Sequence, residues 1–128
     1  MTDFTPFEAL LAGHAGLLSD STHDRWVRAQ ALFEERAYRE AIVLLKELLD
    51  DTAEIEHGLT EARLLLARSY YHSALLGPAI DAARDVLAID PHEPYAHLLL
   101  GRSLQRQSKP DEAAPHLKLA ELPGGYAT

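Results

Sequence analysis

The chain has 128 residues, which is long enough for one domain with a packed core and too short for two. Apolar residues make up 47% of the sequence and charged residues 25%, a balance typical of folded globular chains. The formal net charge of −8 argues against nucleic acid or an anionic membrane as partner, because both repel an acidic protein. The absence of cysteine excludes disulfides, thiolate metal sites and cysteine nucleophiles.

The first six residues, Met-Thr-Asp-Phe-Thr-Pro, have neither the basic nor the apolar region of a signal peptide. No later segment approaches about eighteen uninterrupted apolar residues, the length that would cross a membrane. We therefore expect no membrane span, and the cytoplasm is the default location.

Residues 1–21 are predicted to form an N-terminal helix and a linker. Thr5, Pro6 and Glu8 match a helix start, with a capping hydroxyl, a proline in the first turn and an acid that reaches back to the cap. This helix would carry one apolar stripe, formed by Phe7, Leu10, Leu11, Leu17 and Leu18. The polar run 19–22 is predicted to end the stripe and to cap the next helix.

Apolar residues then recur at helical spacing from residue 22 to 122, with breaks near 36–37, 50–59, 76–78, 90–94 and 108–110. The breaks divide this part of the chain into six helices of about 12 to 14 residues, a usual length in globular proteins. Strands are not expected, because Val, Ile and Thr are scattered and do not alternate with polar residues. The sequence therefore predicts an all-α domain over residues 22–122 and a flexible tail over 123–128.

A repeat relates these helices in pairs. The small residues Ala29, Ala67 and Gly101, one in the first helix of each pair, have the spacing i, i+38 and i+72. The same spacing relates the members of further columns: Leu32, Tyr70 and Leu104; Ala41, Ala79 and Ala113; Leu45, Ala83 and Leu117; Leu48, Val86 and Ala120. Small residues let paired helices approach closely and larger ones interlock neighbouring pairs, so the three pairs are expected to share one core.

These columns resemble the tetratricopeptide repeat family. Its pattern has a small residue and an aromatic or Leu on the first helix, an Ala that opens the second, and a Pro at the end. The matching residues are Ala67, Tyr70, Ala79 and Pro91 in the middle repeat, Leu100, Gly101, Leu104 and Ala113 in the last, and Ala29, Leu32, Tyr38 and Ala41 in the first. The pattern departs where the family often has Trp, at Arg25, Arg63 and His97, and Arg28 replaces an expected Leu. Over residues 22–122 the resemblance implies a right-handed α-solenoid of three antiparallel helix pairs, preceded here by the extra N-terminal helix.

In this family the first helices of successive pairs line a concave groove that holds a peptide. Trp26, Gln30 and Phe33 share one helix face at spacings i, i+4 and i+7. The repeat interval carries that face to the remaining groove residues, which are Leu64, Arg68, Tyr71, Leu98, Arg102 and Gln105. Aromatic and arginine side chains are common interface anchors. We therefore predict a protein-protein interaction module, an adaptor or scaffold, that binds a peptide segment with apolar and acidic residues.

Two other interpretations of these residues remain open. Arg68 and Arg102 would be ordinary surface charges if they pair with the chain's own carboxylates, such as Glu34 and Glu61. The aromatic residues of the first helix face, Trp26 and Phe33, would be core residues if they pack against the N-terminal helix.

The sequence offers no material for an enzyme, a cofactor or a metal site. The seven histidines do not show a recognised ligand spacing. Carboxylates adjacent in sequence, such as Glu34 and Glu35, diverge on a helix and cannot act as a paired acid and base. His72 and His97 are placed to meet in the groove, where protonation would tune binding.

The carboxyl-terminal end suggests an alternative function, homo-oligomerisation through the terminal helices. Residues 122–128 cannot form a further helix, so the last predicted helix would leave Leu117, Leu119 and Ala120 partly uncovered. A homodimer formed through this end, or by exchange of the N-terminal helix, would follow.

Overall fold

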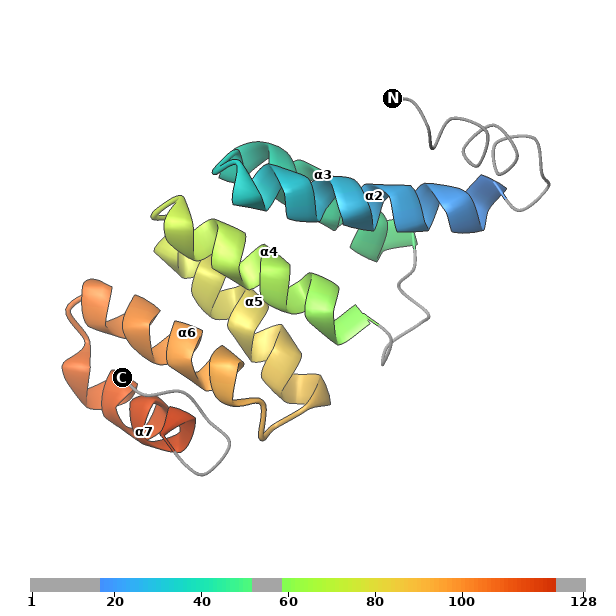
Figure 1. Cartoon of the computed structure of the whole chain (residues 1–128). Helices are drawn as coiled ribbons and strands as arrows, with labels where there is room; N and C mark the ends of the chain where they lie inside the picture. Colours follow the sequence, from blue (N-terminus) through green and yellow to red (C-terminus); the bar gives the residue numbers. More distant parts are fainter. Residues whose placement is uncertain (1–16, 52–58, 122–128) are drawn as a thin grey trace.

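The computed structural model describes residues 17–51 and 59–121, and over these ranges the chain is all helical (Figure 1). The helices are α2 (Leu17–Glu34), α3 (Tyr38–Asp51), α4 (Thr60–His72), α5 (Leu76–Ile89), α6 (Pro94–Arg106) and α7 (Pro110–Ala120). The prediction of an all-α repeat fold is confirmed. The predicted helix start at Thr5 to Glu8 and the tail 123–128 lie outside the described residues.

The helices form three pairs, α2 with α3, α4 with α5 and α6 with α7, which stack in chain order (Figure 1). Each helix packs against its neighbours in sequence. In addition α4 contacts both α2 and α6, so the first helices of the three pairs lie side by side. This arrangement brings together residues that are one repeat apart in sequence.

The predicted columns form the core between the helices. Ala29 and Ala67 are fully buried, as are Ala41, Ala79 and Ala113 at the start of the second helices. At Gly101, helices α6 and α7 approach so closely that a side chain does not fit, because a Cβ built there would lie 2.6 Å from Cδ2 of Leu117 on α7. The wider positions of the core are filled by larger residues: Leu45, Leu48, Val86, Leu100 and Leu104. Helix propensity alone would not hold helices this short, so their stability comes from this shared packing.

The turn inside each pair has the same backbone. Arg36, Ala74 and Ser108 have left-handed φ angles of 66°, 62° and 64°. The residue after each donates its N–H to a carbonyl five residues earlier, on Leu32, Tyr70 and Leu104, over 2.8 to 2.9 Å. This is the Schellman ending of a helix, in which glycine usually occupies the left-handed position. Here none of the three is glycine, and they too have the spacing i, i+38 and i+72 of the repeat.

Two predicted boundaries are wrong. The run 19–22 is predicted to separate two helices, yet α2 begins at Leu17 and continues through it. Ser and Asp disfavour a helix by less than about 0.7 kcal/mol each, which the rest of a long helix easily overcomes. The second error is at 76–78, where Leu76, Gly77 and Pro78 form the first turn of α5 rather than a break. Proline is tolerated there because the first N–H groups of a helix have no intrahelical partner.

The last helix is better covered than the sequence indicated. Ala120 is fully buried, and Leu117 packs against the core cluster around Leu100 and Leu104. Leu119 is 42% exposed, so of the three residues predicted to be uncovered it alone presents a large apolar surface.

Candidate functional site

The predicted groove face contains a pocket around Arg68. This pocket, of about 140 Å³, lies among α2, α4 and the start of α6, and we call it the Arg68 pocket. Its lining includes five predicted groove residues, Trp26, Gln30, Phe33, Leu64 and Arg68, together with Glu34, Glu61, Leu65 and Tyr95. Phe33 and Leu64 are nearly buried, at 8% and 6% exposure, and provide the apolar part of the lining.

Two aromatic rings hold the guanidinium of Arg68. Its central carbon lies 4.4 Å from the ring centroid of Phe33 and 5.3 Å from that of Tyr95. Both distances are within the range of a cation–π interaction. Tyr95 is positioned by the start of α6, where the Glu93 carboxylate accepts a hydrogen bond from the Tyr95 backbone N–H at 3.0 Å. The rings fix the guanidinium but do not use its hydrogen-bonding capacity.

No carboxylate neutralises Arg68 within the described residues. Over residues 17–51 and 59–121, Arg68 does not form an ion pair with Glu34 or Glu61, although both acids line the same pocket. The Nε atom of Arg68 is buried and has no hydrogen-bond partner. An ion pair does join Arg25 of α2 to Asp51 of α3, but neither of these residues lines the Arg68 pocket. Arg68 is therefore oriented but available to a ligand.

A second group of cations lies at the carboxyl-terminal ends of the first helices. His72 contacts the rings of Phe33, Tyr38 and Tyr71 at centroid distances of 5.1 to 5.6 Å. Partial burial and the positive charges of Arg68, Arg36 and Arg106 lower the pKa of His72 below its ordinary value. The three arginines place positive charge at this end of the face, in a protein whose net charge is negative.

The other predicted groove residues do not line the Arg68 pocket. Tyr71 is half-buried beneath the guanidinium of Arg106, whose central carbon is 5.0 Å from the ring centroid. Leu98 and Arg102 are half-buried on α6, and Gln105 is exposed there. The structure thus gathers the predicted residues of α2 and two of the three on α4, Leu64 and Arg68, in one pocket, while Tyr71 and the predicted residues of α6 lie outside it.

His97 does not meet His72, so that prediction is wrong. Its Nδ1 lies 3.1 Å from Nδ1 of His116 on α7, and its Nε2 lies 2.9 Å from the carbonyl oxygen of Pro91. The carbonyl can only accept, so Nε2 of His97 carries the proton and His116 donates to Nδ1 of His97. Burial, His97 and Arg84 lower the pKa of His116. The pair links α6 and α7.

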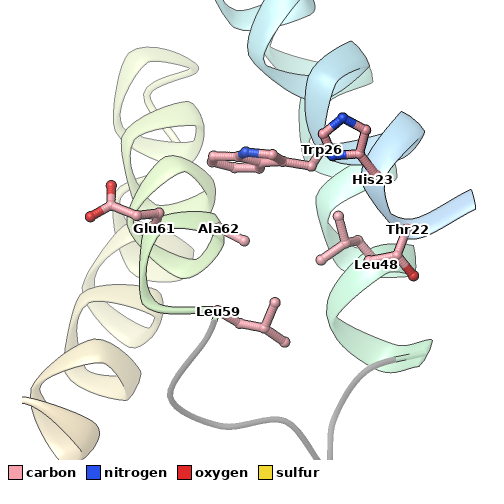
Figure 2. Close-up of a pocket in the computed structure, with 7 residues that line it drawn as sticks. All are labelled: Thr22, His23, Trp26, Leu48, Leu59, Glu61 and Ala62. Atoms are coloured by element: carbon pink, nitrogen blue, oxygen red, sulfur yellow. The ribbon is translucent and has the colours of Figure 1, made fainter. Parts of the chain in front are cut away.

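A larger cavity adjoins the Arg68 pocket (Figure 2). It has a volume of about 380 Å³ and is lined by Thr22, His23, Trp26, Leu48, Leu59, Glu61 and Ala62. Figure 2 shows the Trp26 ring reaching from α2 toward α4 across one end of the cavity, while Leu48 of α3 and Leu59 point into it. We call it the Trp26 pocket. Trp26 and Glu61 line both pockets, so the two are neighbours.

Sequence reasoning missed Tyr95, Glu34 and Glu61 as members of the site. Tyr95 was detectable as an aromatic residue in the first turn of the third pair, but its contact with Arg68 depends on how α6 crosses α4. Glu34 comes four residues after Gln30, and Glu61 comes three residues before Leu64, so helical spacing could have placed both carboxylates beside the predicted groove residues.

The described residues hold no group of three or more His, Asp or Glu side chains that would bind a metal ion. Among the same residues, no helix is both long and apolar enough to span a membrane.

Comparisons with known proteins agree with the fold. No protein-family model matches the chain, and no curated protein matches it in sequence. The solved structure of MamA, from residue 41 to its end, from Desulfovibrio magneticus RS-1, is similar with a TM-score of 0.67 and 25% sequence identity. The match covers 77% of this chain and 54% of the MamA chain, so this chain spans about half the length of that neighbour. With the columns and turns described above, this similarity identifies a tetratricopeptide-like helical repeat fold.

Proposed function

We propose that this chain is a protein-protein interaction module, an adaptor or scaffold, that binds a peptide segment on the face formed by α2, α4 and α6. The peptide carries apolar and acidic residues. Arg68 is the observation that supports this most directly: its guanidinium is held between Phe33 and Tyr95 at a pocket, with no carboxylate partner among the described residues. A partly desolvated cation gains about 1.5–3 kcal/mol from a charge-assisted hydrogen bond, so a carboxylate is its natural ligand.

The fold supports an interaction role over a catalytic one. Helical repeats present extended surfaces on which peptides bind, and the tetratricopeptide-like architecture is one of them. A cytoplasmic location stays a prediction.

Affinity capture from native lysate tests this proposal. The wild-type chain is compared with Arg68→Glu/Arg102→Glu, and with the control Arg39→Glu/Arg84→Glu, which makes the same change in charge at exposed positions of α3 and α5. We expect a protein that the wild type and the control retain and the groove variant loses. Circular dichroism of all three checks that the fold is kept. Equal recovery by the groove variant would refute the assignment of the face.

Leu119 supports a second candidate function, self-association through the last helix. It is 42% exposed on α7, which is the outermost described helix at that end of the stack. Light scattering of the wild type and of Leu119→Lys distinguishes this candidate. A dimer that dissociates in the variant supports it, and a monomeric wild type at high concentration refutes it.

A further inference from the structure

The Trp26 pocket and the Arg68 pocket differ in chemistry. The Trp26 pocket is walled mainly by apolar groups from three helices: Trp26 of α2, Leu48 of α3, and Leu59 and Ala62 at the start of α4. In Figure 2 the carboxylate of Glu61 is turned away from the cavity, so its polar end does not fill this space. The volume of about 380 Å³ is at the lower end of the range for ligand sites and suits one bulky apolar side chain rather than a whole folded surface.

The distance between the two pockets follows from α4. Ala62 lines the Trp26 pocket and Arg68 the other, and they occupy positions i and i+6 of the same helix. At about 1.5 Å of rise per residue, this spacing is about 9 Å along the helix axis. An extended peptide advances about 3.3 Å per residue, so roughly three residues of it cover the same distance.

We infer that the two pockets form one bipartite site for a linear peptide motif. A bulky apolar side chain of the partner enters the Trp26 pocket, and a carboxylate three positions away in the extended peptide binds Arg68. This inference rests on the proposed function and specifies its ligand. The motif is defined by its spacing: a large aliphatic or aromatic residue and an Asp or Glu stand three positions apart. The peptide can run in either chain direction along α4.

Charge selects the acidic member of this motif. Arg68 is the cation oriented into the site, and Arg36 and Arg106 add positive charge at the adjoining end of the face, where all three act on His72. Glu34 and Glu61 oppose an acidic ligand, but both are exposed and screened by water, whereas Arg68 is half-buried between two rings. The site therefore favours a carboxylate at Arg68, and removing the charge of Glu34 should strengthen it.

The chain supplies its own probe for the test. Trp26 is the single tryptophan of the sequence and forms part of the apolar wall, so its fluorescence reports occupancy of that pocket. Peptides with a Gly/Ser background, capped at both ends, carry one Leu or Phe and one Glu, with the spacing varied from one to six positions. Binding is measured on the full-length chain by anisotropy of a label on the peptide and by Trp26 emission.

We expect the tightest binding at a spacing of three, with a change in Trp26 emission. Arg68→Gln should weaken the Glu peptide about tenfold or more and its Gln counterpart less, since only the Glu peptide pairs a carboxylate with the guanidinium. Ala62→Leu, which narrows the cavity, should weaken every peptide with a large apolar residue. If Ala62→Leu does not fold, Leu59→Ala replaces it, because this substitution alters the lining of the same pocket at a half-buried position. Glu34→Gln should tighten the Glu peptide.

Affinity that does not depend on spacing, or binding that leaves Trp26 emission unchanged, would overturn the bipartite site while the interaction role survives. A change of Trp26 emission with protein concentration alone, together with a dimer by light scattering, would show that a second copy fills the cavity, and would also overturn it. If no peptide binds, the bipartite site is wrong, and the lysate capture decides independently whether the proposed function fails with it.

Discussion

Replacing Gly101 by alanine tests how closely α6 and α7 approach each other. A Cβ at this position would lie 2.6 Å from Cδ2 and 2.7 Å from Cγ of Leu117, and 3.3 Å from its backbone nitrogen. Because Cγ is almost as close as Cδ2, rotation of the terminal methyl groups cannot relieve the overlap. Leu117 must change its χ1 rotamer or α7 must move.

The two contributions to the stability have opposite signs. Forcing an extra methyl group into a packed interface costs about 2 kcal/mol. Alanine is favoured over glycine inside a helix by about 1 kcal/mol. The expected net loss for Gly101→Ala is therefore about 1 kcal/mol, which lowers the melting temperature of a domain of this size by roughly 4 °C.

Thermal unfolding followed by circular dichroism measures this difference. Gly77→Ala is the matched control, because a Cβ at Gly77, in the first turn of α5, has no atom within 4 Å. It should leave the melting temperature unchanged or raise it. In a Leu117→Ala background the overlap with Cγ and Cδ2 is gone and only the 3.3 Å contact with the backbone nitrogen remains, so Gly101→Ala should become stabilising. The reasoning is refuted if Gly101→Ala raises the melting temperature of the wild-type chain as Gly77→Ala does.

Three further predictions concern the core, a turn and a histidine pair. Leu45→Ala, at a fully buried position between helices, should cost about 3 kcal/mol in denaturant unfolding, whereas Val43→Ala, at 56% exposure on the same helix, should change stability by less than about 0.5 kcal/mol. Ala74→Gly should raise the melting temperature, because a left-handed φ of 62° costs a residue with a Cβ about 1 kcal/mol relative to glycine; a lower melting temperature would contradict this. The pKa of His116 is lowered by burial, His97 and Arg84, so the unfolded chain binds this proton more readily, and stability should fall as the pH drops below about 6.5. Urea unfolding from about pH 7.5 to 5 should show that the free energy of unfolding depends less steeply on pH in His116→Gln than in the wild type. The part of the dependence due to His72, whose pKa is also lowered, should remain. An identical pH dependence in the variant would exclude the histidine pair as its source.

The helices and the repeat were predictable because both follow from the spacing of residues along the chain. The spacing of apolar residues defines each helix, and the repeat interval that separates Ala29, Ala67 and Gly101 relates the pairs to one another. The boundaries at 19–22 and 76–78 were wrong, because polar residues and a proline are compatible with the first turns of a helix.

The candidate site was predictable only in part. Trp26, Gln30 and Phe33 share a face of α2, and Leu64 and Arg68 share the equivalent face of α4, so the two sets meet where these helices lie side by side. Equivalent positions on α6 did not join the same pocket, which is lined by α2 and α4 and includes only Tyr95 from α6. Tyr95 reaches Arg68 instead, through a contact between helices that no spacing along the chain encodes.

The sequence by itself therefore determined the fold class, the repeat and which residues lie together on one side of a helix, since helical periodicity fixes which residues share a face. Only the tertiary structure decided that Arg68 lies between two aromatic rings without a carboxylate partner in the described chain, that His97 turns to His116 rather than to His72, and that Trp26 stands between two pockets. These features depend on the angles and distances at which separate helices pack, which are set by the fit of side chains across the whole core.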